Sequence, residues 1–516
     1  MRYGFVIDQR KCIGCHACTV ACKEENRVPL GAFRTWVKYV ERGTFPNTRR
    51  YFSVLRCNHC DAAPCVTICP TVALYRRDDG IVDFDGARCI GCKSCMQACP
   101  YDALYIDPQT MTAAKCNYCA HRVEVGLEPA CVIVCPERAI IAGDLDDPAT
   151  QIATIVSREP VQVRKAEQGT RPKVFYLGAD AASLTPELQA PSERYLWAQR
   201  PAEEVDLIRM VAAARQTEQG HGAAGLSRPV YDVPHAVRPW GWKVSAYLWT
   251  KSIAAGALLV AAFAGSDSWG GLFNGIAPAL SLLFLAITTG LLIFDLKRPE
   301  RFAYLVFKPN WRSWLVWGAW ILMAFGAVGV LWLVGGMTGR AGMLHLALIP
   351  SVLLALATAG YSAFLFGQAE GRDFWQSPLV LPHLIIAAVV AGAATLSIAA
   401  AIAPLQSTEA DPSMTLWPLL FLSLVAHGFL VGLEVFNRHA VHDATLAARL
   451  IRRGPYRGRF WVGVALGGVA VPMALMILGA ATDSTVLSAL GALFALGGLW
   501  VWEDLWVRAG QSVPLS

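Results

Sequence analysis

No cysteine follows Cys135 in this chain of 516 residues, so all 16 cysteines lie in its first 135 residues. Charged residues are also scarce, at 16 % of the chain, whereas hydrophobic residues make up 54 %. This balance excludes a purely soluble protein, and the length allows roughly two to four domains. The net charge of +6 is modest and needs no nucleic acid to explain it.

The N-terminus, residues 1–8 (MRYGFVID), contains neither an apolar signal core nor a twin-arginine motif. We therefore expect no export signal at this end.

Tryptophan is distributed in the opposite way to cysteine, because 15 of the 17 tryptophans lie at or after Trp240. An apolar region with aromatic flanks is typical of a membrane domain with interfacial belts.

The cysteines fall into four groups of four. They are Cys12, Cys15, Cys18 and Cys22; Cys57, Cys60, Cys65 and Cys69; Cys89, Cys92, Cys95 and Cys99; and Cys116, Cys119, Cys131 and Cys135. The first and third groups have the spacing C-x2-C-x2-C-x3-C of two-cluster bacterial ferredoxins, in which three thiolates hold one cluster and the fourth holds its neighbour. The sequence therefore predicts four [4Fe-4S] clusters.

Three other uses of these cysteines are disfavoured. Structural zinc prefers separated pairs of ligands to runs of three plus one. Disulfides would need an oxidising compartment and would not explain the repeated triplets. The segment from Cys12 to His16 matches the c-type haem attachment pattern, but it lies inside a longer ferredoxin run.

Short elements are predicted around the cysteines. We expect strands at 5–8 and 81–84, a small helix at 19–25 and a hairpin within 33–56. The phrases CPTVAL, CPYDAL and CPERAI, which begin at Cys69, Cys99 and Cys135, repeat one unit. The pattern indicates an α+β ferredoxin-like iron-sulfur domain over residues 1–145.

A connector over residues 146–240 is predicted to contain one amphipathic helix, from 201 to about 216, packed on the ferredoxin domain. Eight apolar segments follow, each long enough to cross a bilayer. They span 244–264, 274–294, 313–335, 343–366, 379–402, 416–437, 460–480 and 485–506. Residues 241–516 are thus predicted to form an all-α eight-helix transmembrane bundle.

Charge predicts the orientation. The loops after the second, fourth and sixth spans and the C-terminal tail are basic, whereas the loops on the other face contain a single basic residue, Arg340. The basic set is Lys297, Arg298, Arg301, Lys308, Arg312, Arg372, Arg438, Arg449, Arg452, Arg453, Arg457, Arg459 and Arg508. By the positive-inside rule this face is cytoplasmic, so an even number of spans places the iron-sulfur domain in the cytoplasm.

Two families resemble this chain. Residues 1 to about 145 resemble the four-cluster electron-transfer subunit of molybdenum and tungsten oxidoreductases of the dimethyl sulfoxide reductase superfamily. Residues 240–516 look like the quinone-interacting, haem-free NrfD or polysulfide reductase membrane subunit, through segments 247–256 (YLWTKSIAAG), 295–302 (DLKRPERF), 313–320 (SWLVWGAW) and 367–376 (GQAEGRDFWQ). The two parts are usually separate polypeptides.

The resemblance implies that ligands are exchanged between groups one and four and between groups two and three. The implied sets are Cys12, Cys15, Cys18 and Cys135; Cys22, Cys116, Cys119 and Cys131; Cys57, Cys60, Cys65 and Cys99; and Cys69, Cys89, Cys92 and Cys95. It also implies a large molybdopterin-containing catalytic subunit as partner, with membrane lipid and a quinone, either menaquinone or ubiquinone. The location expected is the bacterial inner (cytoplasmic) membrane, and sulfite is a possible substrate of the partner by analogy.

A quinone site needs polar groups for the carbonyls and a protonatable group. Lys251 is the first candidate because it must lie within the first span, although its side chain could also extend to the surface. The other candidates are Tyr247, Asp295, Arg298, His383 and Glu434. Three of these have a plainer alternative: Tyr247 could pack at the interface, Glu434 could pair with Arg438, and His383 could bond a neighbour.

A haem-bearing membrane anchor would need two histidines at one depth. Helix rise places His345 near the outer face, His427 near the middle and His383 near the inner face, so no haem is expected. Our main hypothesis is a quinone-linked electron-transfer and anchor subunit. The alternatives are a redox-driven proton-translocating subunit of a larger respiratory complex and a passive anchor for a soluble electron carrier.

Overall fold

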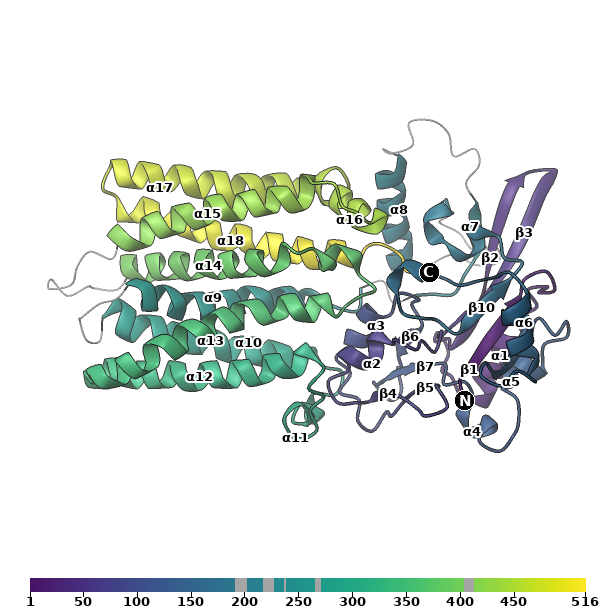
Figure 1. Ribbon diagram of the computed structural model, residues 1–516. Helices are drawn as coiled ribbons and strands as arrows, with labels where there is room; N and C mark the ends of the chain where they lie inside the picture. Colours follow the sequence, from purple (N-terminus) through teal and green to yellow (C-terminus); the bar gives the residue numbers. More distant parts are fainter. Residues whose placement is uncertain (191–201, 217–226, 236–237, 265–270, 403–412) are drawn as a thin grey trace.

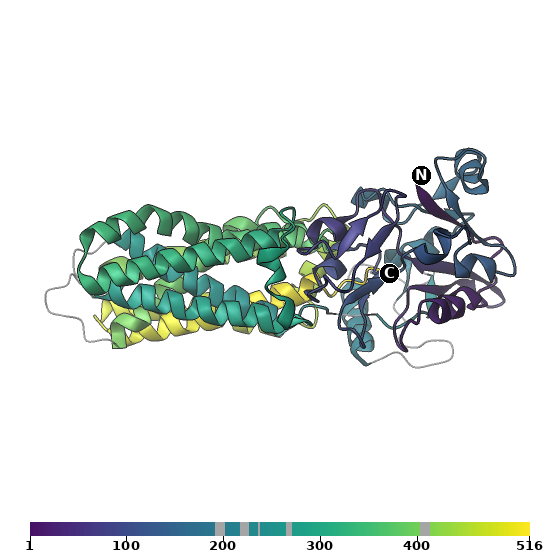
Figure 2. The ribbon, with the colours of Figure 1, turned by 90° about the horizontal axis from the view of Figure 1, so that it is seen from below.

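The computed structural model describes residues 1–190, 202–216, 227–235, 238–264, 271–402 and 413–516. It has two parts, an iron-sulfur part made of short strands and helices and a bundle of long helices (Figure 1). The long helices run side by side, and the iron-sulfur part covers one end of them, as the view turned by 90° also shows (Figure 2).

Two larger sheets organise the iron-sulfur part. The first has the order β8-β1-β10-β9, with β1 parallel to β10 and antiparallel to β8. The second has the order β11-β2-β3. Their strands are β1 (Tyr3–Asp8), β8 (Ile140–Asp144), β9 (Val161–Gln162), β10 (Val174–Leu177), β2 (Thr35–Thr44), β3 (Asn47–Arg56) and β11 (Arg228–Tyr231). The predicted first strand and the predicted hairpin are thus confirmed.

Two small hairpins complete this part, β4 (Leu74–Arg76) with β5 (Val82–Phe84), and β6 (Leu104–Ile106) with β7 (Ala113–Lys115). The repeated phrases have one structure: β4, β6 and β8 each begin at the last residue of a phrase. The third residue after each leading cysteine, namely Val72, Asp102 and Arg138, has a positive φ near 50°. The sequence repeat is therefore also a repeat of backbone conformation.

Short helices carry or flank the cysteines. They are α1 (Ala17–Glu25), α2 (Pro64–Ile68), α3 (Ser94–Ala98), α4 (Ala120–Val123) and α5 (Ala130–Ile133), followed by α6 (Gln151–Arg158) and α7 (Ala181–Leu184). Helices this short have too little hydrogen bonding to be stable alone. We infer that packing against the rest of the iron-sulfur part holds them in place.

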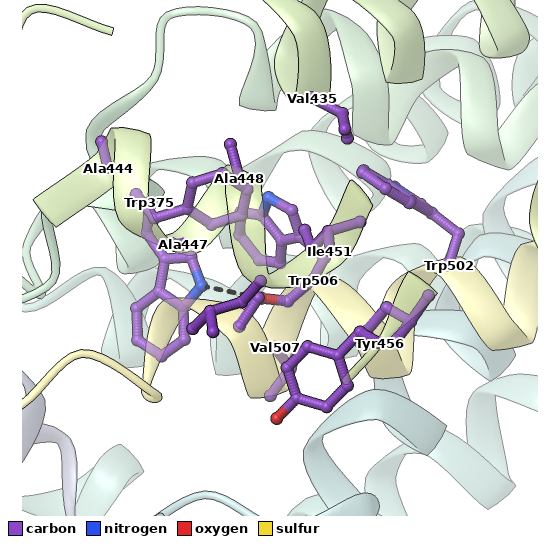
Figure 3. Close-up of a cluster of buried hydrophobic side chains, with 14 of the residues drawn as sticks. Trp375, Val435, Ala444, Ala447, Ala448, Ile451, Tyr456, Trp502, Trp506 and Val507 are labelled. Carbon is purple, nitrogen blue, oxygen red and sulfur yellow. Dashed lines mark hydrogen bonds between the residues drawn. The ribbon is translucent and has the colours of Figure 1, made fainter. Parts of the chain in front are cut away.

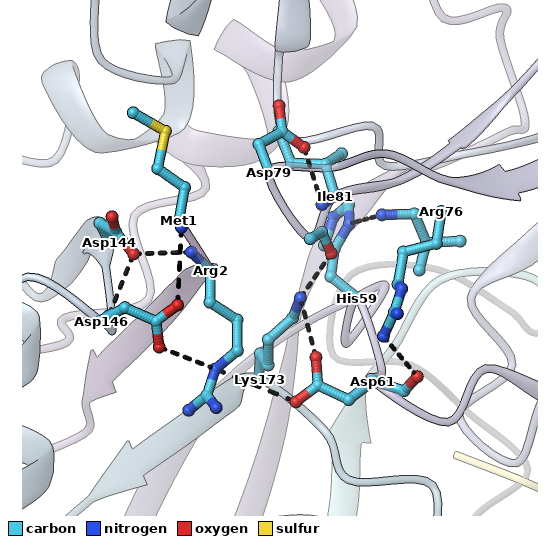
Figure 4. Close-up of polar contacts among 12 residues, drawn as sticks. Met1, Arg2, His59, Asp61, Arg76, Asp79, Ile81, Asp144, Asp146 and Lys173 are labelled. Carbon is cyan, nitrogen blue, oxygen red and sulfur yellow. Dashed lines mark hydrogen bonds and ion pairs between the residues drawn. The ribbon is translucent and has the colours of Figure 1, made fainter.

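Hydrogen bonds and ion pairs around Met1 and Arg2 hold the start of β1 in place (Figure 4). The backbone N–H of Arg2 donates to Asp144 at 2.6 Å, and the Arg2 side chain lies 3.7 Å from Asp146. Lys173, which is buried just before β10, pairs with Asp61 at 3.3 Å. Because Asp61 lies within the second cysteine group, the network joins the neighbours of β1 to the metal-binding region.

The segment expected to be a connector contributes three strands to these sheets, β9, β10 and β11. The pairing of β10 with β1 favours an iron-sulfur domain that continues beyond residue 145, and the exact division of the chain stays a prediction. The predicted helix is α8 (Ala202–Gln216), while Pro201 lies outside the described residues.

The expectation that α8 packs on the ferredoxin domain is wrong. Its buried side chains Leu207 and Val211 belong to a hydrophobic cluster with Tyr456 and Val507 of the helical part. The helix α16 (His442–Arg452) and the end of α18 (Thr485–Gly510) contribute side chains to the same cluster, so the buried side of α8 covers apolar residues of the helical part.

Eight helices in the described residues are long and apolar enough to cross a membrane, as predicted. They are α9 (Trp242–Ala264), α10 (Ala277–Asp295, extended at its start by a π-helical turn), α12 (Trp314–Thr338), α13 (Ala341–Gly367), α14 (Val380–Ile402), α15 (Ser413–Phe436), a π-helical segment Arg459–Ala470 continued by α17 (Val471–Ala481), and α18. A short α11 (Tyr304–Phe307) joins α10 to α12.

A core of large aromatic side chains closes the end of the bundle near the iron-sulfur part. Trp375, Trp502 and Trp506 pack there with Ile451 of α16 and with Tyr456 (Figure 3). The indole N–H of Trp375 donates to the carbonyl of Trp506 at 3.4 Å. This packing fixes α18 against α16 and so positions the C-terminal residues between the two parts.

Candidate functional site

The structure describes all 16 cysteines; none of them forms a disulfide, and Cys15 is the one that is exposed. Three sets of four line small voids in the protein: Cys12, Cys15, Cys18 and Cys135; Cys22, Cys116, Cys119 and Cys131; and Cys69, Cys89, Cys92 and Cys95. The remaining four, Cys57, Cys60, Cys65 and Cys99, interact electrostatically with one another. We call the set that contains Cys12 set A and the set that contains Cys22 set B. The set that contains Cys57 is set C, and the set that contains Cys69 is set D.

The four sets are those that the family resemblance implied, with ligands exchanged between distant groups. Cys135 joins the first group, Cys22 joins the fourth and Cys69 joins the third. The structure brings the thiols together, and their role as iron ligands stays a prediction.

The chemistry of the sets suits a metal cluster. Burial raises the pKa of the Cys18, Cys92 and Cys116 thiols to about 12, so without a metal they would be neutral. A bound metal stabilises the thiolate and reverses this preference. Zinc would draw four sulfurs to about 2.3 Å from one point, whereas the thiols of sets A, B and D surround voids. In the described part of the chain, no three His, Cys, Asp or Glu side chains are placed to hold a single ion.

The sets form a row. Cys18 of set A is a close electrostatic neighbour of Cys131 in set B, and Cys116 of set B is a neighbour of Cys57 in set C. Cys65 of set C is a neighbour of Cys95 in set D. Set A contains the exposed thiol, so the row runs from the surface toward set D.

Set D lies against the helical bundle. The indole N–H of Trp240 donates to the carbonyl of Cys92 at 3.1 Å, and Arg301 donates to the carbonyl of Cys89 at 3.0 Å. The side chain of Asn310 donates to the carbonyl of Cys69 at 2.7 Å. Three cysteines of set D are therefore held, through their backbone carbonyls, by residues in the segments that border α9, α10 and α12.

A cavity of about 580 Å³ opens between the bundle helices at this place. Its walls are mostly Leu, Ile, Val and aromatic side chains of α9, α10, α12 and α13, and its polar lining includes Tyr247, Thr289 and Asp295. Cys92 and Ser94 also line it. An apolar pocket with few polar groups suits a lipid-soluble ring compound, and here it touches a cysteine of set D.

Lys251 is buried one turn beyond Tyr247 on α9, so it does not extend to the surface. Its ammonium donates to Ser362 at 2.8 Å and to the carbonyl of Ala359 at 2.9 Å. Ser362 also bonds the side chain of Tyr247, which lines the cavity. Lys251 is therefore connected to the cavity through one serine and one tyrosine.

Asp295 and Arg298 have different positions. Asp295 lines the cavity and pairs with Lys93 of the third cysteine group at 2.8 Å. Arg298 donates to the carbonyl of Thr110 at 2.8 Å and lies near Glu300. The structure thus places Asp295 at the cavity and Arg298 at the contact with the iron-sulfur part.

His383 and Glu434 form a second buried polar group, away from the cavity lining. The Nδ1 of His383 lies 3.8 Å from Oε2 of Glu434. Glu434 also accepts a hydrogen bond of 2.6 Å from the indole of Trp506. The predicted ion pair of Glu434 with Arg438 is wrong, because the carboxylate points into the bundle and Arg438 is exposed.

The argument that no two histidines share a depth is also wrong. The rings of His383 and His427 are in contact, with 5.0 Å between their centroids. Helix rise measures depth only from each helix's own end, so it does not fix the relative depth of side chains on two different helices.

The sequence prediction missed Glu503 and Lys93. Glu503 is buried on α18, 3.5 Å from Ser252, and interacts electrostatically with Lys251. A carboxylate inside the eighth apolar span is unusual enough to mark a functional group. Lys93 gave no comparable signal, because its partner Asp295 is 202 residues away.

Comparison with known proteins agrees with this arrangement. Residues 232–511 match the family described as polysulphide reductase, NrfD. Residues 48–145 match a 4Fe-4S dicluster domain, and residues 10–26 match a 4Fe-4S binding domain.

Curated relatives include subunits of reductases. A tetrathionate reductase subunit of Salmonella typhimurium is 49 % identical over 200 residues, which cover 38 % of this chain and 80 % of the relative. Protein NrfC of Escherichia coli is 43 % identical over 178 residues, 34 % of this chain and 80 % of the relative. A polysulfide reductase subunit of Wolinella succinogenes is 41 % identical over 179 residues, 34 % of this chain and 93 % of the relative.

The apolar cavity at set D, the eight spans and the match over more than half of the chain agree with one another. The chain therefore belongs to the polysulphide reductase NrfD family and carries, ahead of the membrane domain, a 4Fe-4S ferredoxin domain related to the iron-sulfur subunits of molybdenum reductases.

Proposed function

We propose that this protein is the electron-transfer and membrane-anchor subunit of a quinone-linked molybdenum or tungsten oxidoreductase. The observation that carries the proposal is the position of Cys92, which belongs to set D and also lines the membrane cavity. Single electrons delivered by a cluster there would arrive beside the pocket that suits a quinone, either menaquinone or ubiquinone.

Four [4Fe-4S] clusters, one in each of the four cysteine sets, would form the electron path. The thiols of each set supply four ligands, which is the number that such a cluster needs. The row of neighbouring sets supports a path from the exposed Cys15 to the membrane. Clusters supply one-electron transfer, and no haem is expected in the path.

The partner would be a large molybdopterin-containing catalytic subunit docked at set A. Exposed apolar side chains occur in the loops and helices that carry sets A and B, namely Ile13, Val20, Ile133 and Val134. Apolar groups exposed beside a redox centre suit a protein interface. The relatives include subunits of tetrathionate, polysulfide and thiosulfate reductases, which favours an inorganic sulfur compound, such as sulfite, as the partner's substrate.

Protons for the quinone would come from this chain's own side chains. Tyr247 faces the cavity, Ser362 links it to Lys251, and Glu503 lies beyond Lys251. This order gives a relay of hydroxyl, ammonium and carboxyl groups in which each neighbour can accept or donate a proton. Asp295 would orient the quinone from the other wall of the cavity.

The iron-sulfur domain would face the cytoplasm of a bacterium, with the bundle in its inner membrane. The basic loops after α10, α13 and α15 lie at the same end of the bundle as this domain. The positive-inside rule assigns that end to the cytoplasm. Protease added to spheroplasts should therefore leave the ferredoxin part intact, and cleavage there would reverse the orientation.

A second candidate function is proton translocation driven by the redox domain. It is favoured by the buried group of His383, His427 and Glu434, which does not line the cavity. Proteoliposomes that move more protons than quinone chemistry consumes would support this function. A value equal to the quinone stoichiometry would leave only the anchor function.

The main test is anaerobic purification from membranes. We expect about 16 iron atoms and about 16 labile sulfides per chain, a co-purifying large chain with molybdenum or tungsten, and quinone-linked activity that stops when that chain is removed. Zinc in place of iron, or a complete preparation without a second large chain, would contradict the proposal.

A further inference from the structure

Arg56 is the last residue of β3 and is buried, with 1 % of its surface exposed. Its Nη1 lies 3.2 Å from the sulfur of Cys131. Its guanidinium stacks over the ring of Phe5, with 4.4 Å between the guanidinium carbon and the ring centre. A permanently charged group is therefore held in the interior by a thiol and an aromatic ring.

The side chain also lines the void of set B, together with its four cysteines. In the described part of the chain, the Nε and Nη2 of Arg56 have no hydrogen-bond partner. Buried donors without partners are costly and uncommon. A cluster in this void would bring sulfur acceptors to them, so the unpaired donors fit an anionic group at this place.

Among the described residues, the voids of sets A and D are lined by no unpaired lysine or arginine. Lys93 lines the void of set D, but its ammonium pairs with Asp295. The void of set A is lined by Glu137 and His16 and by no lysine or arginine among the described residues. Set B has Arg56 and also Arg34, whose guanidinium donates to two polar side chains outside the set, Asn26 and Tyr105.

We propose that Arg56 is a positioning residue that sets the reduction potential of the cluster in set B, raising it above the value that the four thiolates alone would give. Reduction adds one negative charge to the cluster, and a fixed positive charge with N–H donors stabilises that state in a low-dielectric interior. The cluster in set B, the second of the row, would then hold an electron during its transfer between the partner and the membrane. The inference depends on the proposed four-cluster function.

The test uses the complete complex and an EPR-monitored redox titration. Arg56→Gln should keep its iron and lower the midpoint potential of one cluster. Arg56→Lys keeps a charge and should shift that potential less. Arg164→Gln is a matched control, because Arg164 is also buried, at 2 % exposure, but donates to the carbonyls of Leu184 and Leu515. In the Arg164→Gln complex, the cluster affected by Arg56→Gln should keep its midpoint potential.

An Arg56→Gln complex with full iron and unchanged potentials would overturn the inference. A second measurement needs no variant: in protein grown with ¹⁵N-labelled arginine, one reduced cluster should show hyperfine coupling to a guanidinium nitrogen. Absence of that coupling would also overturn it. Failure of the proposed function is distinguishable, because it would appear as iron far below about 16 atoms in the unaltered chain.

Discussion

The iron-sulfur part and the membrane bundle form their sites in opposite ways. Each cysteine set takes three thiols from one short stretch and one from a partner stretch. The polar groups of the bundle meet across long separations: Lys251 and Ser362 are 111 residues apart, and Glu434 and Trp506 are 72 apart. Local spacing therefore encodes the first chemistry, whereas helix packing creates the second.

The largest expected effect comes from the point where the two parts meet. Cys92→Ala should remove one ligand of set D, lower the iron content from about 16 to about 12 atoms per chain, and reduce quinone-linked electron transfer to background. Iron analysis and quinone reductase assays of the purified complex measure this. Ser94→Ala, beside it in the cavity lining, is the control that should keep its iron; full activity of Cys92→Ala would remove set D from the path.

A change inside the bundle should separate proton chemistry from the electron path. Lys251→Met should lower quinone-linked turnover by about 100-fold, the usual scale for a lost acid-base group, while the iron content and the cluster spectra stay unchanged. Steady-state kinetics with a quinone analogue test this. Lys243 lies on the same helix, but its ammonium donates to the carbonyl of Phe294, so the turnover of Lys243→Met should remain near normal. Equal losses of turnover in both variants would refute a special role for Lys251.

An intermediate effect is expected at the ion pair between the two parts. Asp295→Asn removes the charge that holds Lys93 at 2.8 Å, and a partly buried pair of this kind contributes about 1 kcal/mol or somewhat more. We expect cluster reoxidation by quinone to slow about tenfold and hydrogen exchange over residues 89–95 to increase. Stopped-flow and exchange measurements test both. Glu300→Gln, which changes an exposed carboxylate of the neighbouring loop, should alter neither.

The smallest effect is a pH dependence within the iron-sulfur part. Burial disfavours the charged form of His235, but Asp232 and Asp102 outweigh it and raise its pKa to about 10; the Asp102 pair is 2.7 Å long. An unfolded histidine has a pKa near 6.5, so the stabilisation is complete below about pH 6.5 and is lost as the pH rises toward 10.

His235→Gln should therefore lower the melting temperature by a few °C at pH 6.5, with a smaller difference from the unaltered protein at pH 9. Thermal scans across this range measure it. A constant difference at every pH would show that the charge of His235 contributes nothing to stability.

The ferredoxin elements and the eight spans could be predicted because their signals are local. A cysteine repeat fixes loop geometry within a few residues, and a run of apolar residues needs no partner to mark a membrane helix. The position of α8 and the contact of His383 with His427 could not be predicted, because each depends on how the ends of helices meet. Glu503 had a readable signal and was missed.

The sequence by itself determined that this chain has sixteen thiols in four ferredoxin groups and eight apolar spans. The tertiary structure alone decided which thiol set meets the membrane, that Asp295 and Tyr247 share a cavity with Cys92, and that Arg56 lies in the void of set B. Spacing along the chain specifies groups that fold locally, whereas a site between helices exists only after packing has brought distant residues into contact.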